Sequence, residues 1–221
     1  MKCYVENKCK KCKRGECVKE LCGMRLLINS AYSSSNIPKR YLRDVVLEPE
    51  QVDLNAFTLL SKYITNVVKY VEEGKGIYIY STNCGNGKTT WSTVIARTYI
   101  HKKAYEQEFK DLVYFVNVAD YLESLKQCFN GNGVTAEIEA PLKDCKLLIL
   151  DDIGVEKSSE WAIERLYALL NYRCNEEKAT IITSNLDLAN LNIKLNSRIS
   201  SRIKDMCVPI ELKGSDRRGT L

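Results

Sequence analysis

The chain has 221 residues, 45% of them hydrophobic and 28% charged, which is enough material for one main domain and a small appendage. No run reaches the length of about 18 apolar residues that marks a transmembrane helix, and the first ten residues, MKCYVENKCK, lack the apolar stretch of a secretion signal. These features argue against a membrane or secreted protein, so we expect a cytoplasmic protein without a membrane partner.

Positive charge and cysteine are concentrated at the N-terminus. Residues 1–25 contain eight of the 33 basic residues and three of the 28 acidic ones, which accounts for the whole net charge of +5. Five of the ten cysteines also lie in the first 22 residues. We therefore predict a Cys-rich segment at 1–25 and a main domain at 54–221. Residues 26–53 are expected to form a linker, because a Ser cluster and Pro38 are typical of loops.

Helices and strands are predicted to alternate through the main domain. A helix is expected first, at 54–72, and glycines at 74 and 76 would end it. The expected strands are 77–80, 113–118, 147–150, 180–183 and 208–212, and the expected helices between them are 89–100, 121–129, 160–173 and 197–204. This alternation predicts an α/β fold, in which helices cover both faces of a parallel five-stranded sheet.

The first predicted strand runs directly into a glycine-rich loop. Its nine residues are Thr82, Asn83, Cys84, Gly85, Asn86, Gly87, Lys88, Thr89 and Thr90. Phosphate binding requires glycines where backbone N–H groups curl around oxygens, a lysine that reaches the β and γ phosphates, and a hydroxyl for Mg²⁺. Thr82 replaces the first glycine of G-x-x-x-x-G-K-[ST], but its own N–H group is retained. The loop predicts a P-loop that binds ATP with Mg²⁺.

A second motif ends the predicted strand at 147–150. The residues KLLILDD are an apolar run, as expected for a buried strand, and they end in two carboxylates. Carboxylates at the carboxyl end of a parallel strand face the ligand crevice. We expect Asp151 and Thr89 to hold Mg²⁺, and Asp152 to orient or deprotonate the attacking water. The two motifs together predict a P-loop NTPase that hydrolyses ATP.

These motifs resemble those of the AAA+ ATPases of the DnaC/DnaI helicase-loader type and of the related transposition helper ATPases. The resemblance covers residues 35–221 and includes the sequences IPKRY, GIYIY, LLILDDIG and ATIITSNL. It implies an AAA+ ATPase domain without the helical lid that many AAA+ proteins carry at the C-terminus.

The resemblance also implies roles for four polar residues. Asn185 matches the position called sensor 1, which contacts the γ phosphate or the lytic water, although an asparagine that caps a following helix is an alternative. Arg198 and Arg202 lie in the arginine-finger region, where an arginine reaches the ATP of the adjacent subunit. They are four residues apart and therefore share a helix face. Arg217 is the nearest match to sensor 2, and solvated surface positions are the alternative for all three arginines.

The N-terminal cysteines predict a metal site. Cys9, Cys12, Cys17 and Cys22 place four thiols close together in a chain expected in a reducing compartment. Tetrahedral zinc is the natural use of such a set, and it would supply the folding free energy of a segment too short for an apolar core. Cys3 could replace any of the four. An iron–sulfur cluster and unliganded thiols remain alternatives.

The function implied by the resemblance is the ATP-dependent loading of a replicative DNA helicase onto single-stranded DNA. Some loaders carry a zinc-binding N-terminal region that contacts the helicase, and the Cys-rich segment is similar to a shortened version. An ATP-dependent homo-oligomer is expected, in the host cytoplasm if the chain is phage-encoded. The alternatives are an IstB-like transposition helper that binds DNA and recruits a transposase, and a zinc-dependent adaptor with little ATP turnover.

Overall fold

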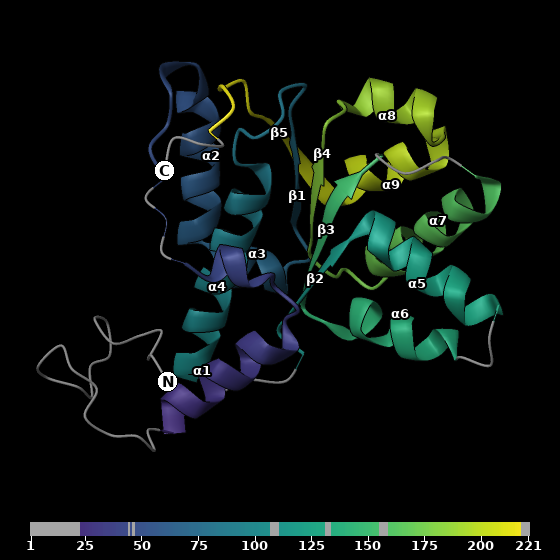
Figure 1. Ribbon diagram of the computed structural model, residues 1–221. Coiled ribbons are helices and arrows are strands. Elements are labelled where there is room, and N and C mark those ends of the chain that lie inside the picture. The colour runs from purple at the N-terminus through teal and green to yellow at the C-terminus, as the bar shows by residue number, and fades with distance from the viewer. Residues whose placement is uncertain are drawn as a thin grey trace, which may run out of the picture.

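A parallel β-sheet between two layers of helices forms the protein, as the computed structural model shows (Figure 1). The structure describes residues 23–43, 45, 47–106, 111–130, 134–154 and 159–217. Within these residues the sheet has five strands in the order β2-β3-β4-β1-β5, and every pair of neighbours is parallel. The strands are β1 (Gly76–Tyr80), β2 (Val113–Asn117), β3 (Leu147–Ile153), β4 (Thr180–Ser184) and β5 (Cys207–Glu211). The predicted α/β class and parallel sheet are confirmed.

Two groups of helices cover the two faces of the sheet. The first group is α1 (Gly23–Ser34), α2 (Leu54–Thr65), α3 (Val67–Glu72) and α4 (Lys88–Glu106). The second group is α5 (Val118–Asn130), α6 (Thr135–Asp144), α7 (Glu160–Asn175), α8 (Leu188–Lys194) and α9 (Ser197–Met206). Two short 3₁₀ helices, Lys39–Leu42 and Gln51–Asp53, precede α2. Beyond β5, the described chain continues to residue 217 without another helix.

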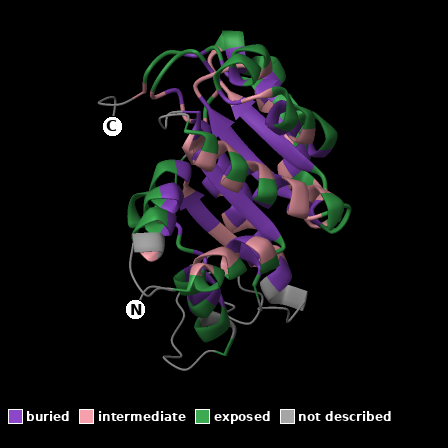
Figure 2. Ribbon diagram, turned by 90° about the vertical axis from the view of Figure 1, so that its right-hand side faces the viewer, coloured by how far each residue is buried: buried purple, intermediate pink, exposed green. Residues whose placement is uncertain are grey.

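Alternating side chains of the strands divide the core into two clusters. In β1, Ile77 and Ile79 pack with the α4 face, whereas Tyr78 between them packs with the α7 and α9 face. Figure 2 shows the sheet almost entirely in the colour of buried residues, with exposed residues on the outer sides of the helices. Since both faces are covered, the inner strands β1, β3 and β4 are buried along almost their whole length, whereas the edge strand β5 exposes Val208, Pro209 and Glu211. Every helix in the described part of the chain is too short or too polar to cross a bilayer.

The stretch expected to be a linker contains a helix of the core. Helix α1 packs against α4, and its Ile28, Ala31 and Tyr32 are buried. The Ser35 carbonyl then accepts a 2.8 Å hydrogen bond from the backbone N–H of Phe115 in β2. The linker prediction for residues 26–53 is therefore wrong for this helical part, because buried contacts hold it to the sheet.

Other differences concern helices alone. The helix expected at 54–72 is two helices, α2 and α3, which are separated by Asn66 with φ −105° and ψ 19°. Helix α6 was not predicted from the sequence, and it contains Pro141.

Candidate functional site

Three loops at the carboxyl edge of the sheet carry the predicted site. The P-loop follows β1, the two aspartates end β3, and Asn185 follows β4. Because β4 lies between β1 and β3, the sheet order brings these loops together. Carboxyl edges of parallel sheets are where such folds bind ligands. Motifs that are far apart in the sequence are therefore neighbours in the structure.

The P-loop has the backbone that its glycines predict. Gly85 and Gly87 have φ values of 72° and 97°, which side chains rarely tolerate. Among the described residues, Thr82 is not one of the non-glycine residues with positive φ, so threonine fits where the pattern usually has its first glycine. The loop leads into the N-terminus of α4, which begins at Lys88 and directs backbone N–H groups toward an anion.

The Lys88 ammonium group lies inside the loop. It donates to the carbonyl oxygen of Asn83 at 2.9 Å and contacts Asn86 Oδ1 at 3.4 Å. The Asn86 side-chain amide in turn donates to Ser81 Oγ at 2.6 Å and to the Leu212 carbonyl oxygen at 3.1 Å. These hydrogen bonds fix a buried cation at the centre of the proposed phosphate cradle.

Two threonine hydroxyls converge on the Asp151 carboxylate. Thr89 Oγ1 donates to Asp151 Oδ1 at 2.9 Å, and Thr183 Oγ1 donates to the same oxygen at 2.8 Å. Asp151 is only 5% exposed, and burial raises its pKa to about 6, although the Thr183 hydrogen bond acts in the opposite direction. Hydroxyl and carboxylate oxygens are the ligands that Mg²⁺ accepts. Thr89 and Asp151 therefore fit a magnesium site.

Asp152 adopts an uncommon backbone conformation at the end of β3. Its φ is 59°, and the register between β3 and β4 shifts between Leu150 and Ile153. Its backbone N–H donates to Thr183 Oγ1 at 2.9 Å. A positive φ is uncommon for a residue other than glycine, and aspartate adopts it more readily than most. The turn separates the Asp152 side chain, which is partly exposed, from the buried Asp151.

The residue before Asn185 joins the two halves of the site. Ser184 pairs with Tyr80 at the end of β1 and with Ile153 at the end of β3. Asn185 is the next residue, and it is partly buried. Asn185 therefore lies between the P-loop and the aspartates, and its role as sensor 1 stays a prediction.

Arg198 and Arg202 lie on the opposite face of the sheet from α4. Both belong to α9, which packs against α7 and α8. The guanidinium carbon of Arg198 is 3.9 Å from the centre of the Tyr167 ring, and Arg202 Nη1 is 3.2 Å from Asp205 Oδ2. The structure therefore groups the two arginines with each other and not with the P-loop helix of their own chain.

Arg217 lies directly beside the P-loop. Its backbone N–H donates to the Gly85 carbonyl oxygen at 3.1 Å, and its side chain donates to the Glu48 carbonyl oxygen at 2.7 Å. A Cβ atom added to Gly85 would lie 1.7 Å from Asp216 Oδ1. The buried Asp53 carboxylate accepts the backbone N–H groups of residues 213 and 214. The segment 212–217 is thus held across the loop, and Gly85 leaves room for it.

Two residues of the site were missed from the sequence. The Thr183 hydroxyl hydrogen-bonds to both the Asp151 carboxylate and the backbone N–H of Asp152. The sequence signal for this role is a hydroxyl side chain two residues before Asn185. Arg40 is close enough to favour the charged form of Asp151. It belongs to the IPKRY sequence, which is part of the family resemblance.

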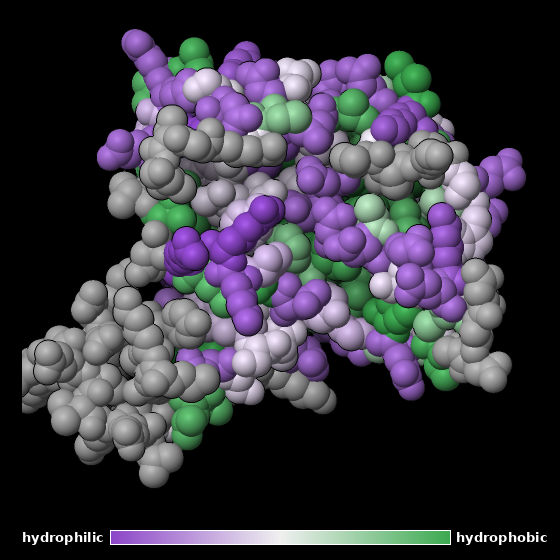
Figure 3. All heavy atoms as spheres, in the orientation of Figure 1, coloured by the Kyte–Doolittle hydropathy of each residue, from purple (hydrophilic) through white to green (hydrophobic). Residues whose placement is uncertain are grey.

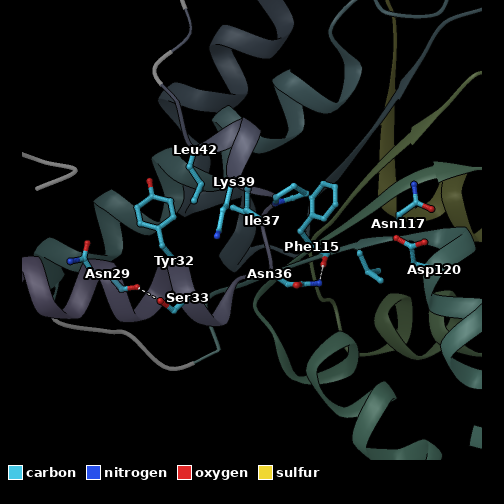
Figure 4. A pocket seen from close by; sticks show the side chains of 12 residues that line it. Asn29, Tyr32, Ser33, Asn36, Ile37, Lys39, Leu42, Phe115, Asn117 and Asp120 are labelled. Atoms are coloured by element: carbon cyan, nitrogen blue, oxygen red, sulfur yellow. Dashed lines mark hydrogen bonds between the residues drawn. The ribbon is translucent and has the colours of Figure 1, made fainter. Parts of the chain in front are cut away.

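A cavity of about 630 Å³ lies next to this site and was also not predicted. Figure 4 shows Lys39 and Leu42 on one side of it, and Phe115, Asn117 and Asp120 on the other. Asn117 pairs in the sheet with Asp151, but the residues that line the cavity do not include the P-loop. The cavity therefore adjoins the phosphate cradle and is separate from it.

Figure 3 shows apolar atoms near the middle of the molecular face seen in Figure 1, with hydrophilic side chains around them.

The predicted zinc ligands, Cys9, Cys12, Cys17 and Cys22, lie outside the described residues, as does Cys3. Within the described ranges, no three side chains of His, Cys, Asp or Glu form a cluster that could hold a metal ion. The zinc site therefore stays a prediction from the sequence.

Comparisons with known proteins agree with the geometry of the site. A family model described as IstB-like ATP binding protein matches residues 53–218. The replicative helicase loader DnaI of Bacillus subtilis (strain 168) is 26% identical over 187 residues, which cover 76% of this chain and 57% of that protein. The replicative helicase loader DnaC of Buchnera aphidicola subsp. Baizongia pistaciae is 30% identical over 129 residues, which cover 58% and 50%.

A solved structure supports the same relationship. The crystal structure of the DnaC helicase loader is 28% identical and has a TM-score of 0.64, and the match covers 80% of this chain and 100% of that one. The chain spans about half the length of the curated relatives it matches.

Proposed function

The chain belongs to the family of IstB-like ATP-binding proteins, and on that basis we propose that it hydrolyses ATP in order to place a replicative DNA helicase on single-stranded DNA. The carrying observation is that Lys88, Thr89 and Asp151 meet at one edge of the sheet, with Thr89 Oγ1 2.9 Å from Asp151 Oδ1. The names of the similar proteins, DnaI and DnaC, support the choice of a helicase as partner.

Each residue has a distinct role in the proposed reaction. The P-loop N–H groups and the Lys88 ammonium group bind the β and γ phosphates. Thr89 and Asp151 would hold Mg²⁺, which neutralises phosphate charge when it is bound. Asp152 orients the attacking water and accepts its proton, while the water oxygen bonds to the γ phosphorus and the bond to the β–γ bridging oxygen breaks. Asn185 donates to the γ phosphate or to that water.

The arginines of α9 would act between subunits. Arg198 and Arg202 lie on the face of the sheet opposite α4, away from the P-loop helix of their own chain. We therefore expect them to contact ATP that is bound by a second copy of the chain. A planar guanidinium can bridge the phosphoryl oxygens, on which negative charge spreads in the transition state. Arg217, which lies at the P-loop, would contact the nucleotide of its own subunit. ATP would thus favour a homo-oligomer, and hydrolysis would release the helicase.

Two substitutions test the nucleotide site. Lys88→Ala should abolish binding of a fluorescent ATP analogue, because it removes the cation from the cradle. Asp152→Asn should retain binding and block hydrolysis, because it removes the group that acts on water. If the Lys88→Ala protein binds the analogue as tightly as the parent, the P-loop assignment is wrong.

The partner is tested by affinity capture from the native host in the presence of ATP, with the Lys88→Ala protein as the matched control. Recovery of the replicative helicase with the parent and not with the control would support a loader. Recovery of a transposase would favour the transposition helper, for which the IstB-like family description provides a reason. ATP turnover that stays absent with DNA and partner present would favour the zinc-dependent adaptor.

A further inference from the structure

Tyr167 on α7 lies against Arg198, one of the two arginines of α9. The guanidinium carbon of Arg198 lies 3.9 Å from the ring centre, which is within the range of a cation–π contact. Hydrogen bonding with Arg198, and then with Arg202, lowers the pKa of Tyr167. Tyr167 and both arginines line a hollow of about 390 Å³ together with Ser197 and Ser201. One aromatic side chain therefore contacts Arg198 directly and lines the same hollow as Arg202.

The helices that carry these side chains, α7 and α9, are closely packed. The neighbours of Tyr167 on α7, Leu166, Leu169 and Leu170, are at most 2% exposed, and Ile199 and Ile203 on α9 are fully buried. The two helices pack directly against each other. An arginine is otherwise a long side chain with many rotamers. A guanidinium that stacks on a fixed ring loses fewer rotamers when it binds a ligand, and stacking leaves in-plane N–H groups able to donate to that ligand.

We propose that Tyr167 is the positioning residue that holds Arg198 for the ATP γ phosphate of a second copy of the chain. This inference rests on the proposed function. The hollow has the chemistry that such a group requires, since two guanidinium groups and two serine hydroxyls can all donate to phosphate oxygens. The Arg202–Asp205 pair is solvent-exposed and therefore weak, so it does not prevent Arg202 from turning to a phosphate.

The first arm of the experiment compares three tyrosine variants of the full chain. Tyr167→Leu removes the ring and the hydroxyl, and ATP hydrolysis should fall about three- to tenfold while the affinity for a fluorescent ATP analogue stays the same. Tyr167→Phe keeps the ring and should lose less activity. Tyr172→Leu is the matched control, because Tyr172 is on the same helix but lies under Lys143 and not under an α9 arginine.

The second arm separates positioning from a general loss of structure. Tyr167→Leu protein is mixed with Lys88→Ala protein, whose own P-loop is inactive and whose arginines are intact. A mixed interface then pairs an intact P-loop with an intact arginine pair, and activity should partly return. A variant that is merely damaged would not recover. The double variant Tyr167→Leu/Arg198→Ala should hydrolyse ATP no more slowly than Arg198→Ala alone, because both changes remove the same interaction.

The single variants Arg198→Ala and Arg202→Ala distinguish the two ways in which the idea can fail. If both hydrolyse ATP like the parent, the inter-subunit site is wrong, and the role of Tyr167 falls with it. If they lose activity but Tyr167→Leu does not, or if the loss in Tyr167→Leu is not recovered by mixing, only the positioning role is overturned. The prediction for the nucleotide site of the same subunit would stand in both cases.

Discussion

Replacement of Asp151 by Asn should stabilise the protein at neutral pH when Mg²⁺ and nucleotide are absent. Asp151 is 5% exposed, and its pKa is raised from the ordinary value of 3.8 to about 6, chiefly by burial. Each pKa unit corresponds to about 1.4 kcal/mol, so the buried carboxylate destabilises the folded state by about 3 kcal/mol once it is ionised. Asparagine keeps an oxygen that accepts from Thr89 and Thr183 and carries no charge.

The sign of the effect follows from proton binding. Between about pH 4 and pH 6 the folded state binds more protons at Asp151 than the unfolded state does, so the free energy of unfolding falls as the pH rises. The stabilising contribution of protonated Asp151 is fully present below the pKa that this group has in the unfolded state, and it is lost above the pKa that it has in the folded state. The advantage of Asp151→Asn should therefore be about 1 kcal/mol near pH 4.5 and should approach about 3 kcal/mol at pH 7.5.

Urea unfolding of both proteins at the two pH values measures this difference. Asp120→Asn is the matched control, because Asp120 is an exposed carboxylate in the first turn of α5. Mg²⁺ with ATP should stabilise the parent more than the variant, since a bound cation favours the ionised carboxylate. An advantage of Asp151→Asn that is equal at pH 4.5 and pH 7.5 would refute the role of the buried charge.

Two further predictions concern Thr183 and the N-terminal segment. Thr183→Val should lower the free energy of unfolding by about 1–3 kcal/mol, because the Asp152 N–H group loses its acceptor. The same change should reduce the rate of hydrolysis more than it reduces the affinity for ATP. An unchanged urea midpoint together with an unchanged turnover rate would contradict this prediction. Purified protein should contain about one zinc per chain, and Cys9→Ser or Cys12→Ser should lose the metal but keep ATP binding. Elemental analysis decides the second case, in which stoichiometric iron with visible absorbance would indicate a cluster and a metal-free protein would eliminate the site.

Local patterns explain what could be predicted from the sequence. The strands of a parallel sheet are continuous apolar runs, so β3 is visible as LLIL, and the aspartates that follow it are necessarily at the carboxyl edge. The P-loop is similarly local, because the phosphate cradle is built from consecutive backbone groups. The structure accordingly brings Lys88, Thr89 and Asp151 together, and their roles in binding stay predictions.

Longer-range effects explain what was missed. Ile28, Ala31 and Tyr32 have helical spacing, but serine and asparagine residues around them gave α1 the composition of a loop. Its helix is stabilised by packing against α4, which the sequence pattern does not reveal. The contact of Tyr167 with Arg198 likewise joins α7 to α9, which are separated in the sequence by β4 and α8. Pairings of this kind depend on tertiary structure.

Asp151 and Arg173 are two of the buried charged residues in the part of the chain that the structure describes, and the difference between them supports the location of the site. Arg173 is fully buried near the amino edge of the sheet, where its guanidinium donates to the carbonyl oxygens of Leu142, Cys145 and Ala179 at 2.7–3.1 Å. Those acceptors are backbone groups that hold β3, β4 and α6 in place, so a structural role accounts for this charge. Asp151 instead receives two hydroxyl donors, one of which belongs to the P-loop. Burial disfavours the ionised form of the Asp151 carboxylate, and a bound cation would favour it. The next residue, Asp152, has a left-handed backbone conformation. The acceptors of Arg173 belong to the scaffold, whereas Asp151 binds a P-loop hydroxyl at the carboxyl edge of the sheet, where a bound cation would compensate for the burial of its carboxylate.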